Sequence, residues 1–175
     1  MKYSFLFILP IFLFSCAKKE SQNTLSVMKN ENTTTYYLIR HAEKDRNNPK
    51  EKDPELIETG IVRAEKWAAI FSEIELDAVY ATPFKRTQQT AAPTAISKNI
   101  EIQSYDPKAI YKSDFKAITK GKTVLVVGHS NSIPKLTNFL LEEEKYEEID
   151  DSINGNLYIV TIQGTKTWSS LLSLE

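Results

Sequence analysis

The chain has 175 residues, with 22 Lys or Arg against 23 Asp or Glu, and its formal net charge is −1 at pH 7. It carries no basic stripe and no interleaving of basic and aromatic residues, which argues against a nucleic-acid partner. The single cysteine, Cys16, excludes a disulfide within the chain.

The first 16 residues have the pattern of an export signal. Lys2 gives a positive start, and residues 3–14 form a mainly apolar run. About a dozen residues fall short of the ~20 that span a bilayer, but suit a signal peptide. Leu13–Cys16 is similar to the lipobox of bacterial lipoproteins. The resemblance implies cleavage before Cys16, acylation of its thiol and a membrane-anchored, exported protein of the bacterial cell envelope. The alternative is an uncleaved anchor in which Cys16 is an incidental thiol.

The remaining chain divides into a tether and one domain. Residues 17–34 are rich in Lys, Ser, Asn, Glu and Thr, so they offer little to bury and are expected to form a flexible tether. Residues 35–175 have the length of one ordinary domain.

Within this domain, segments with the apolar pattern of β-strands alternate with segments that have the apolar period of α-helices. Strands are expected over Thr35–Ile39, Leu76–Tyr80, Ile100–Tyr105 and Thr123–Val127, followed by a hairpin of Asn156–Ile162 and Thr167–Leu174. The first helix is expected to begin at Gly60, with Thr59 as its cap and with its core side formed by Ile61, Ala64, Trp67, Ala68 and Phe71. Further helices are expected over Lys85–Ser97, over Tyr111–Lys120, and after Pro134. The acidic run Glu142–Asp151 is expected to be a solvated helix end and loop without a functional role. The pattern predicts an α/β three-layer sandwich, with a mainly parallel central sheet between helices and an antiparallel edge hairpin at the C-terminus.

The two histidines of the chain each follow a predicted buried strand. His41 comes directly after Arg40 at the end of the first strand, and His129 follows Gly128 at the end of Thr123–Val127. Ligands of α/β proteins bind beyond the carboxyl ends of strands. A guanidinium matches a phosphoryl group, and its charge disfavours the cationic form of a neighbouring imidazole. We therefore expect His41 to be a neutral nucleophile that attacks phosphorus.

A third segment supplies another cation for the same anion. After the turn at Thr82-Pro83, Arg86 falls in the first turn of the predicted helix, where free N–H groups already favour anions. Arg86 is expected to bind phosphate, whereas Lys85 is expected to lie on the surface. His129 is expected to donate a hydrogen bond to a phosphoryl oxygen, with Ser130 beside it in the phosphate-binding set.

These segments together resemble one known family. Arg40-His41-Ala42-Glu43 is similar to the Arg-His-Gly-Glu signature of the histidine phosphatase superfamily, the phosphoglycerate-mutase-like group. Thr82–Ala91 resembles the family's second motif and Gly128-His129 its third. The resemblance implies that His41 is phosphorylated while Arg40, Arg86 and His129 surround the phosphoryl oxygens. It also implies that no metal or other cofactor is required.

The general acid that protonates the leaving oxygen is the least defined part of the site. Asp106 is one candidate, although an aspartate before Pro107 is equally expected to cap a turn. Glu43 is the second, and it is equally expected to orient neighbouring side chains.

The sequence thus predicts a phosphatase that acts on phosphorylated small molecules or envelope components. The alternatives are a phosphohistidine protein phosphatase, a phosphomutase, and a lipoprotein that binds a phosphorylated ligand without catalysis. Specificity is expected to come from the loops at residues 45–55 and 106–114.

Overall fold

The computed structural model describes residues 33–112 and 114–174. The predicted signal peptide, Cys16 and residues 17–32 of the predicted tether lie outside this part of the chain. No helix within the described residues is long and apolar enough to cross a membrane.

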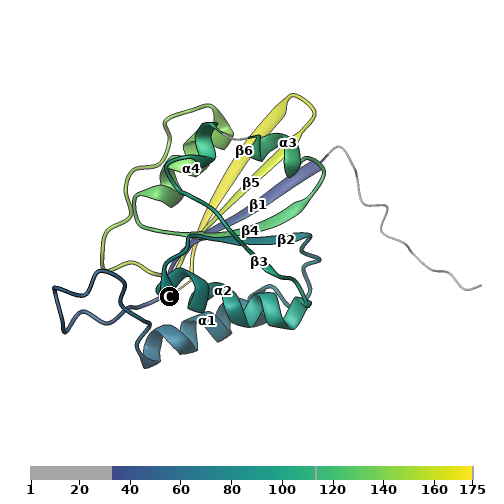
Figure 1. Ribbon diagram of the computed structural model, residues 1–175. Helices are drawn as coiled ribbons and strands as arrows, with labels where there is room; N and C mark the ends of the chain where they lie inside the picture. The colour runs from purple at the N-terminus through teal and green to yellow at the C-terminus, as the bar shows by residue number, and fades with distance from the viewer. Residues whose placement is uncertain (1–32, 113, 175) are drawn as a thin grey trace, which may run out of the picture.

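A six-stranded mixed sheet forms the centre of the described chain (Figure 1). Its strands are β1 (Thr33–Arg40), β2 (Ala78–Ala81), β3 (Ile102–Ser104), β4 (Thr123–Gly128), β5 (Asn156–Gln163) and β6 (Lys166–Ser173). Their order is β3-β2-β4-β1-β5-β6, in which β3, β2, β4 and β1 run parallel and the β5–β6 hairpin is antiparallel. The α/β fold with an antiparallel edge hairpin is therefore as predicted.

Helices cover both faces of this sheet. They are α1 (Glu58–Ile70), α2 (Lys85–Lys98), α3 (Phe115–Ile118) and α4 (Ser132–Leu141), with a short 3₁₀ turn at Ile110–Lys112. Figure 1 shows α1 and α2 on one face and α3 and α4 on the other. The side chains of successive β1 residues lie on opposite faces of the sheet, in two separate hydrophobic cores. Leu38 belongs to the same core as Ile133 of α4, and Ile39 to the same core as Trp67 of α1. Burial on both sides explains why residues 36–39 of β1 and 124–127 of β4 form continuous apolar runs.

Three local predictions are wrong. β1 begins at Thr33, so the last two residues of the predicted tether belong to the sheet. The helix α1 begins at Glu58 after Ile57, which places Thr59 inside its first turn rather than at the cap. Ile61 is 45% exposed rather than buried, because α1 turns its Ala64 and Trp67 side toward the sheet.

The predicted helix Tyr111–Lys120 is also wrong, since the structure has the 3₁₀ turn and then the four-residue α3. Ile110 and Phe115 are both buried in the same core. Five residues along an α-helix rotate a side chain by roughly 140°, so one continuous helix would not turn both toward that core. The break between the two short elements resolves this conflict.

The sheet register brings the ends of three strands together. Arg40 of β1 lies opposite Gly128 of β4, and Ala81 of β2 lies opposite Val127. A side chain at position 128 would meet the Tyr105 hydroxyl at 2.8 Å and the Ser132 hydroxyl at 2.9 Å. Glycine therefore lets β4 end in close contact with the start of α4, and His129 follows at that point.

Candidate active site

His41 is held by the end of the parallel sheet. Its backbone N–H donates to the carbonyl of Gly128 at 2.9 Å, and its side chain is nearly completely buried. The ring Nδ1 lies 2.8 Å from the carbonyl oxygen of Ala42. A carbonyl only accepts, so Nδ1 carries the proton of the neutral ring and Nε2 keeps its lone pair. This is the tautomer that a nucleophile requires.

Burial also keeps His41 neutral. Its pKa is lowered to about 3, mainly by burial and further by the charges of His129, Arg40 and Arg86. The sequence predicts a lowered pKa from Arg40 alone, whereas the structure assigns the largest effect to the removal of water. The hydrogen bond to Ala42 acts in the opposite direction and favours the cationic ring.

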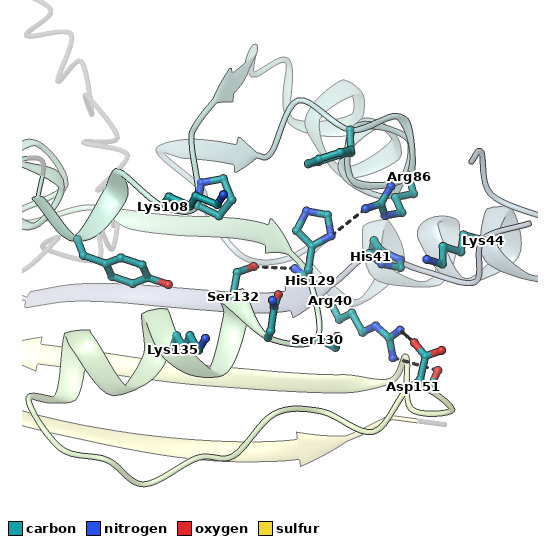
Figure 2. Close-up of a pocket in the computed structure, with 14 residues that line it drawn as sticks. Arg40, His41, Lys44, Arg86, Lys108, His129, Ser130, Ser132, Lys135 and Asp151 are labelled. Atoms are coloured by element: carbon teal, nitrogen blue, oxygen red, sulfur yellow. Dashed lines mark hydrogen bonds and ion pairs between the residues drawn. The ribbon is translucent and has the colours of Figure 1, made fainter. Parts of the chain in front are cut away.

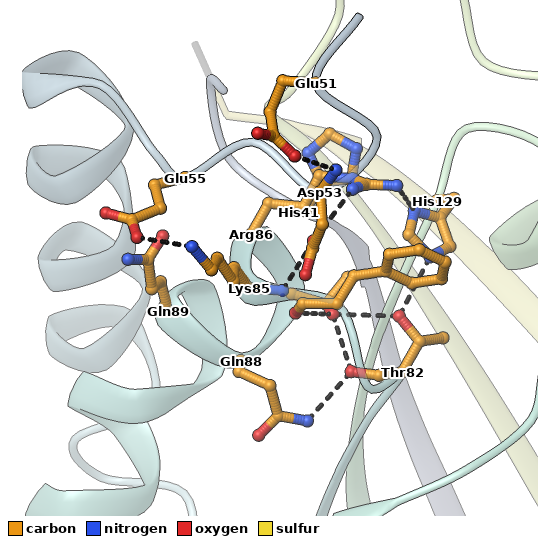
Figure 3. A network of polar contacts seen from close by, with 12 residues as sticks. His41, Glu51, Asp53, Glu55, Thr82, Lys85, Arg86, Gln88, Gln89 and His129 are labelled. Carbon is orange, nitrogen blue, oxygen red and sulfur yellow. Dashed lines mark hydrogen bonds and ion pairs between the residues drawn. The ribbon is translucent and has the colours of Figure 1, made fainter. Parts of the chain in front are cut away.

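His129 faces His41 from the end of β4. The two ring centroids lie 5.5 Å apart at an interplanar angle of 68°. The Nε2 atom of His129 lies 2.9 Å from the hydroxyl of Thr82, and Nδ1 lies 3.5 Å from Nη2 of Arg86 (Figure 3). Burial and the charges of Arg86, Lys44 and Arg40 lower the pKa of His129 to about 4. The predicted convergence of the two imidazoles is present.

Arg86 reaches this point from the first turn of α2, as expected. Its guanidinium stacks over the Phe84 ring at 4.5 Å, and its polar contacts to His129 and Asp53 are both long, at 3.5 Å. Its Nε is buried and has no partner among the described residues. The guanidinium therefore retains donors for an anion. Lys85, by contrast, pairs with Glu55 on the surface, as predicted.

Arg40 makes more protein contacts than predicted. Its side chain is buried, and Nη1 donates to the carbonyl oxygens of Asp150, Asp151 and Ile153 at 2.8–3.1 Å. Nη2 donates to the Asp151 carboxylate. The Nε atom is buried without a partner among the described residues. Arg40 thus fixes the loop before β5, and its role in binding a phosphoryl oxygen stays a prediction.

Asp151 is a site residue that the sequence analysis missed. Its carboxylate contacts Arg40 (Figure 2) and also Arg46, and these contacts, with Arg46 first, hold its pKa at about 2. It stands at the end of the acidic run Glu142–Asp151, which was assigned no functional role. Nothing in the sequence distinguishes it from the other acidic residues there, because the contact to Arg40 spans 111 positions.

These groups line one cavity of about 610 Å³ (Figure 2). Its walls include the predicted Arg40, His41, Arg86, His129 and Ser130, and also Lys44, Phe84, Pro107, Lys108, Tyr111, Asn131, Ser132, Lys135 and Asp151. The Ser130 hydroxyl lies 3.5 Å from Glu148, a long contact. Among the predicted specificity loops, 106–114 contributes to the walls and 45–55 does not.

The comparisons with known proteins match part of the chain to one family. Residues 36–107 match the model of the histidine phosphatase superfamily (branch 1). This match agrees with the superfamily that the motifs of the sequence predict. Phosphoserine phosphatase 1 of Hydrogenobacter thermophilus is 38% identical over 73 residues, which are 39% of this chain and 35% of that protein. The match thus spans about a third of that relative.

Solved structures show the same fold. A protein histidine phosphatase SixA complexed with tungstate has a TM-score of 0.62 at 17% identity, covering 79% of this chain and 96% of that one. Phosphoglycerate mutase from Bacillus anthracis has a TM-score of 0.61 at 14% identity, covering 83% and 94%. At these identities the likeness concerns the fold alone.

Neither predicted general acid is among the residues that line this cavity in the described chain. Asp106 is exposed, and its carboxylate accepts the backbone N–H of Lys108 at 2.8 Å, which is the turn cap considered as its alternative role. Glu43 accepts from Nε of Arg63 at 2.8 Å, and its second oxygen is buried without a partner among the described residues. The role of each in catalysis stays a prediction.

The described residues contain no group of three or more His, Cys, Asp or Glu side chains placed to hold a metal ion. The cations and imidazoles of the cavity are instead suited to an anion, because Arg86 and Arg40 present buried N–H groups toward which a phosphoryl oxygen can be directed. Whether the reaction proceeds without a metal stays a prediction.

Proposed function

We propose that this chain is a phosphatase that hydrolyses phosphate monoesters through a covalent phosphohistidine on His41. The observation that carries the proposal is the contact of Nδ1 with the Ala42 carbonyl, because it leaves Nε2 unprotonated beside His129 and Arg86. Phosphoryl transfer depends chiefly on positioning and charge stabilisation, and the cavity supplies both.

In the first step Nε2 of His41 attacks phosphorus, a P–N bond forms, and the bond to the leaving oxygen breaks. That oxygen takes up a proton, and the alcohol departs. The ring then carries a positive charge, which the Ala42 carbonyl stabilises through Nδ1–H. In the second step water attacks phosphorus, the P–N bond breaks, and inorganic phosphate leaves with neutral His41.

The test is turnover of 4-nitrophenyl phosphate by the wild type and by His41→Ala, combined with labelling by a radioactive phosphate ester and an alkaline quench, which preserves a P–N bond. We expect His41→Ala to lose turnover by several orders of magnitude and to lose the acid-labile label. Equal turnover in the two proteins would exclude His41 as the nucleophile. A wild type that binds phosphate but never turns over would favour the non-catalytic alternative.

A phosphohistidine substrate is a second candidate. No carboxylic acid other than Asp151 lines the cavity of the described chain, and Asp151 stays ionised because its pKa is about 2. A site without a carboxylic acid favours leaving groups that depart readily, such as the imidazole of phosphohistidine. Faster turnover of a phosphohistidine peptide than of alkyl phosphates would support this candidate, and the reverse order would exclude it.

We further propose that the protein is exported and anchored through an acylated Cys16. The support is the run of residues 3–14 followed by the lipobox-like Leu13–Cys16. The proposed substrates are then phosphorylated small molecules or envelope components. Metabolic labelling with a fatty acid tests the anchor: label should appear in the wild type and be absent from Cys16→Ser. Label in both proteins would contradict it.

A further inference from the structure

Two lysines face the outer part of the cavity from separate elements. Lys108 lies in the turn after β3, and Lys135 lies in α4. Both line the cavity that holds His41 and His129, and Figure 2 shows them on the opposite side of His129 from Lys44. The fold therefore brings together two cations that are 27 positions apart, on the side of the cavity away from Lys44.

Neither lysine has an ion-pair partner within the described residues. Lys85 and Lys116, which are also on the surface, pair with Glu55 and Glu142 at 2.9 and 2.8 Å. Among the described residues that line the cavity, the one carboxylate is that of Asp151, and it is already shared between Arg40 and Arg46. The ammonium groups of Lys108 and Lys135 thus lack the counter-charges that Lys85 and Lys116 have.

The cavity is also larger than the phosphate position requires. Its volume of about 610 Å³ falls in the range of sites that enclose a whole small molecule, ~300–1,000 Å³. Tyr111 lines the same space and packs edge-on against Phe139 at 5.6 Å between ring centroids. A phosphoryl group at His41 would leave this outer space for the rest of the substrate.

We propose that Lys108 and Lys135 form an outer anion subsite that binds a second negatively charged group, a carboxylate or a phosphate, on the leaving-group side of a phosphate monoester. This proposal rests on the proposed phosphatase function and specifies its substrate class. The two ammonium groups attract the second charge, and Tyr111 contacts the carbon skeleton between the two anions. Because both lysines are exposed, the attraction weakens as salt rises.

A matched pair of substrates tests the subsite on the full chain. Propyl phosphate and 3-phosphonooxypropanoate differ by a carboxylate in place of a methyl group, and propane-1,3-diyl bisphosphate carries a phosphate there instead. We expect the wild type to favour one or both of the charged substrates in kcat/KM. The double variant Lys108→Gln/Lys135→Gln should lose about three- to tenfold on the favoured substrate, because exposed charge contacts are individually weak. The loss on propyl phosphate should be smaller, because its single phosphate is bound in the inner pocket.

Lys120→Gln is the matched control, since Lys120 is exposed and does not line this cavity. Comparison of kcat/KM for 3-phosphonooxypropanoate and for propane-1,3-diyl bisphosphate shows whether the subsite binds a carboxylate or a phosphate. Equal losses on propyl phosphate and the charged substrates, or no preference in the wild type, would overturn the subsite while leaving the phosphatase function intact. Calorimetric binding of the same three compounds to His41→Ala separates the two proposals, because it requires no turnover. If neither charged compound binds more tightly there than propyl phosphate, the subsite is excluded.

Discussion

The inner pocket and the outer rim of the cavity are built by different means. In the inner pocket, the side chains of His41 and Arg40 are almost fully buried, and protein contacts fix the nitrogens that do not face the anion. At the rim, Lys108 and Lys135 are exposed and have no ion-pair partner within the described residues. The inner groups are suited to chemistry, which needs fixed geometry, and the outer groups to the selection of a substrate.

The difference follows from the elements that carry each group. The inner residues follow β1 and β4, whose register is fixed by backbone hydrogen bonds across the centre of the sheet. The rim residues lie in a turn and on the exposed side of α4, where a change of side chain disturbs no buried contact. Variation in substrate can therefore arise at the rim without loss of the pocket that holds the phosphoryl group.

After the loss of His41 itself, the largest effect on turnover should come from removing an inner cation. Arg86→Ala takes away a guanidinium whose Nε and long contacts leave it free for the phosphoryl oxygens. We expect kcat/KM for 4-nitrophenyl phosphate to fall by about 10²–10³, the usual cost of losing one such donor. The neighbouring Lys85→Ala is the control and should stay within about twofold, because its pair with Glu55 is on the surface. Similar losses in both variants would contradict the distinction between the two regions.

Protonation of the two histidines tests the burial of the inner pocket. Both pKa values are lowered, to about 3 for His41 and about 4 for His129, so both rings should stay neutral as the pH falls from 8 to 5. An ordinary histidine with a pKa near ~6.5 would become mostly cationic over that range.

Nuclear magnetic resonance can follow each ring directly, because the chain contains two histidines. We expect neither ring to show a midpoint between pH 8 and 5. In Arg86→Ala both pKa values should rise, since the charge of Arg86 lowers both. A wild-type midpoint near 6.5 for His41 would show that its ring is hydrated rather than enclosed.

How far sequence predicts this molecule depends on the range of the interactions concerned. The structure brings His41, Arg86 and His129 into one cavity, as the sequence predicts, because each follows a local pattern: an apolar strand that ends, or a turn that opens a helix. Asp151 was missed because its role arises from a contact with Arg40 across 111 positions. The break between Ile110 and Phe115 was missed because helical propensity does not reveal that both side chains enter one core.

Asp106 lies beside the rim residue Lys108, and its substitution should give the smallest effect on turnover. If Asp106 protonates the leaving oxygen, Asp106→Asn should slow alkyl phosphates more than aryl phosphates, because aryl leaving groups need less protonation. In the structure its carboxylate instead accepts the N–H of Lys108, the residue that lines the rim. An asparagine oxygen can accept the same hydrogen bond, so the turn should survive the substitution.

The contacts of the described chain therefore favour changes within about twofold on both substrate classes for Asp106→Asn. Asp106→Ala removes the turn cap, so it should act through Lys108 and weaken the charged substrates of the outer subsite more than propyl phosphate. The measurement is kcat/KM for 4-nitrophenyl phosphate, propyl phosphate and 3-phosphonooxypropanoate in the three proteins. If Asp106→Asn selectively slows propyl phosphate, Asp106 is the general acid, because loss of the turn cap alone would slow alkyl and aryl phosphates equally.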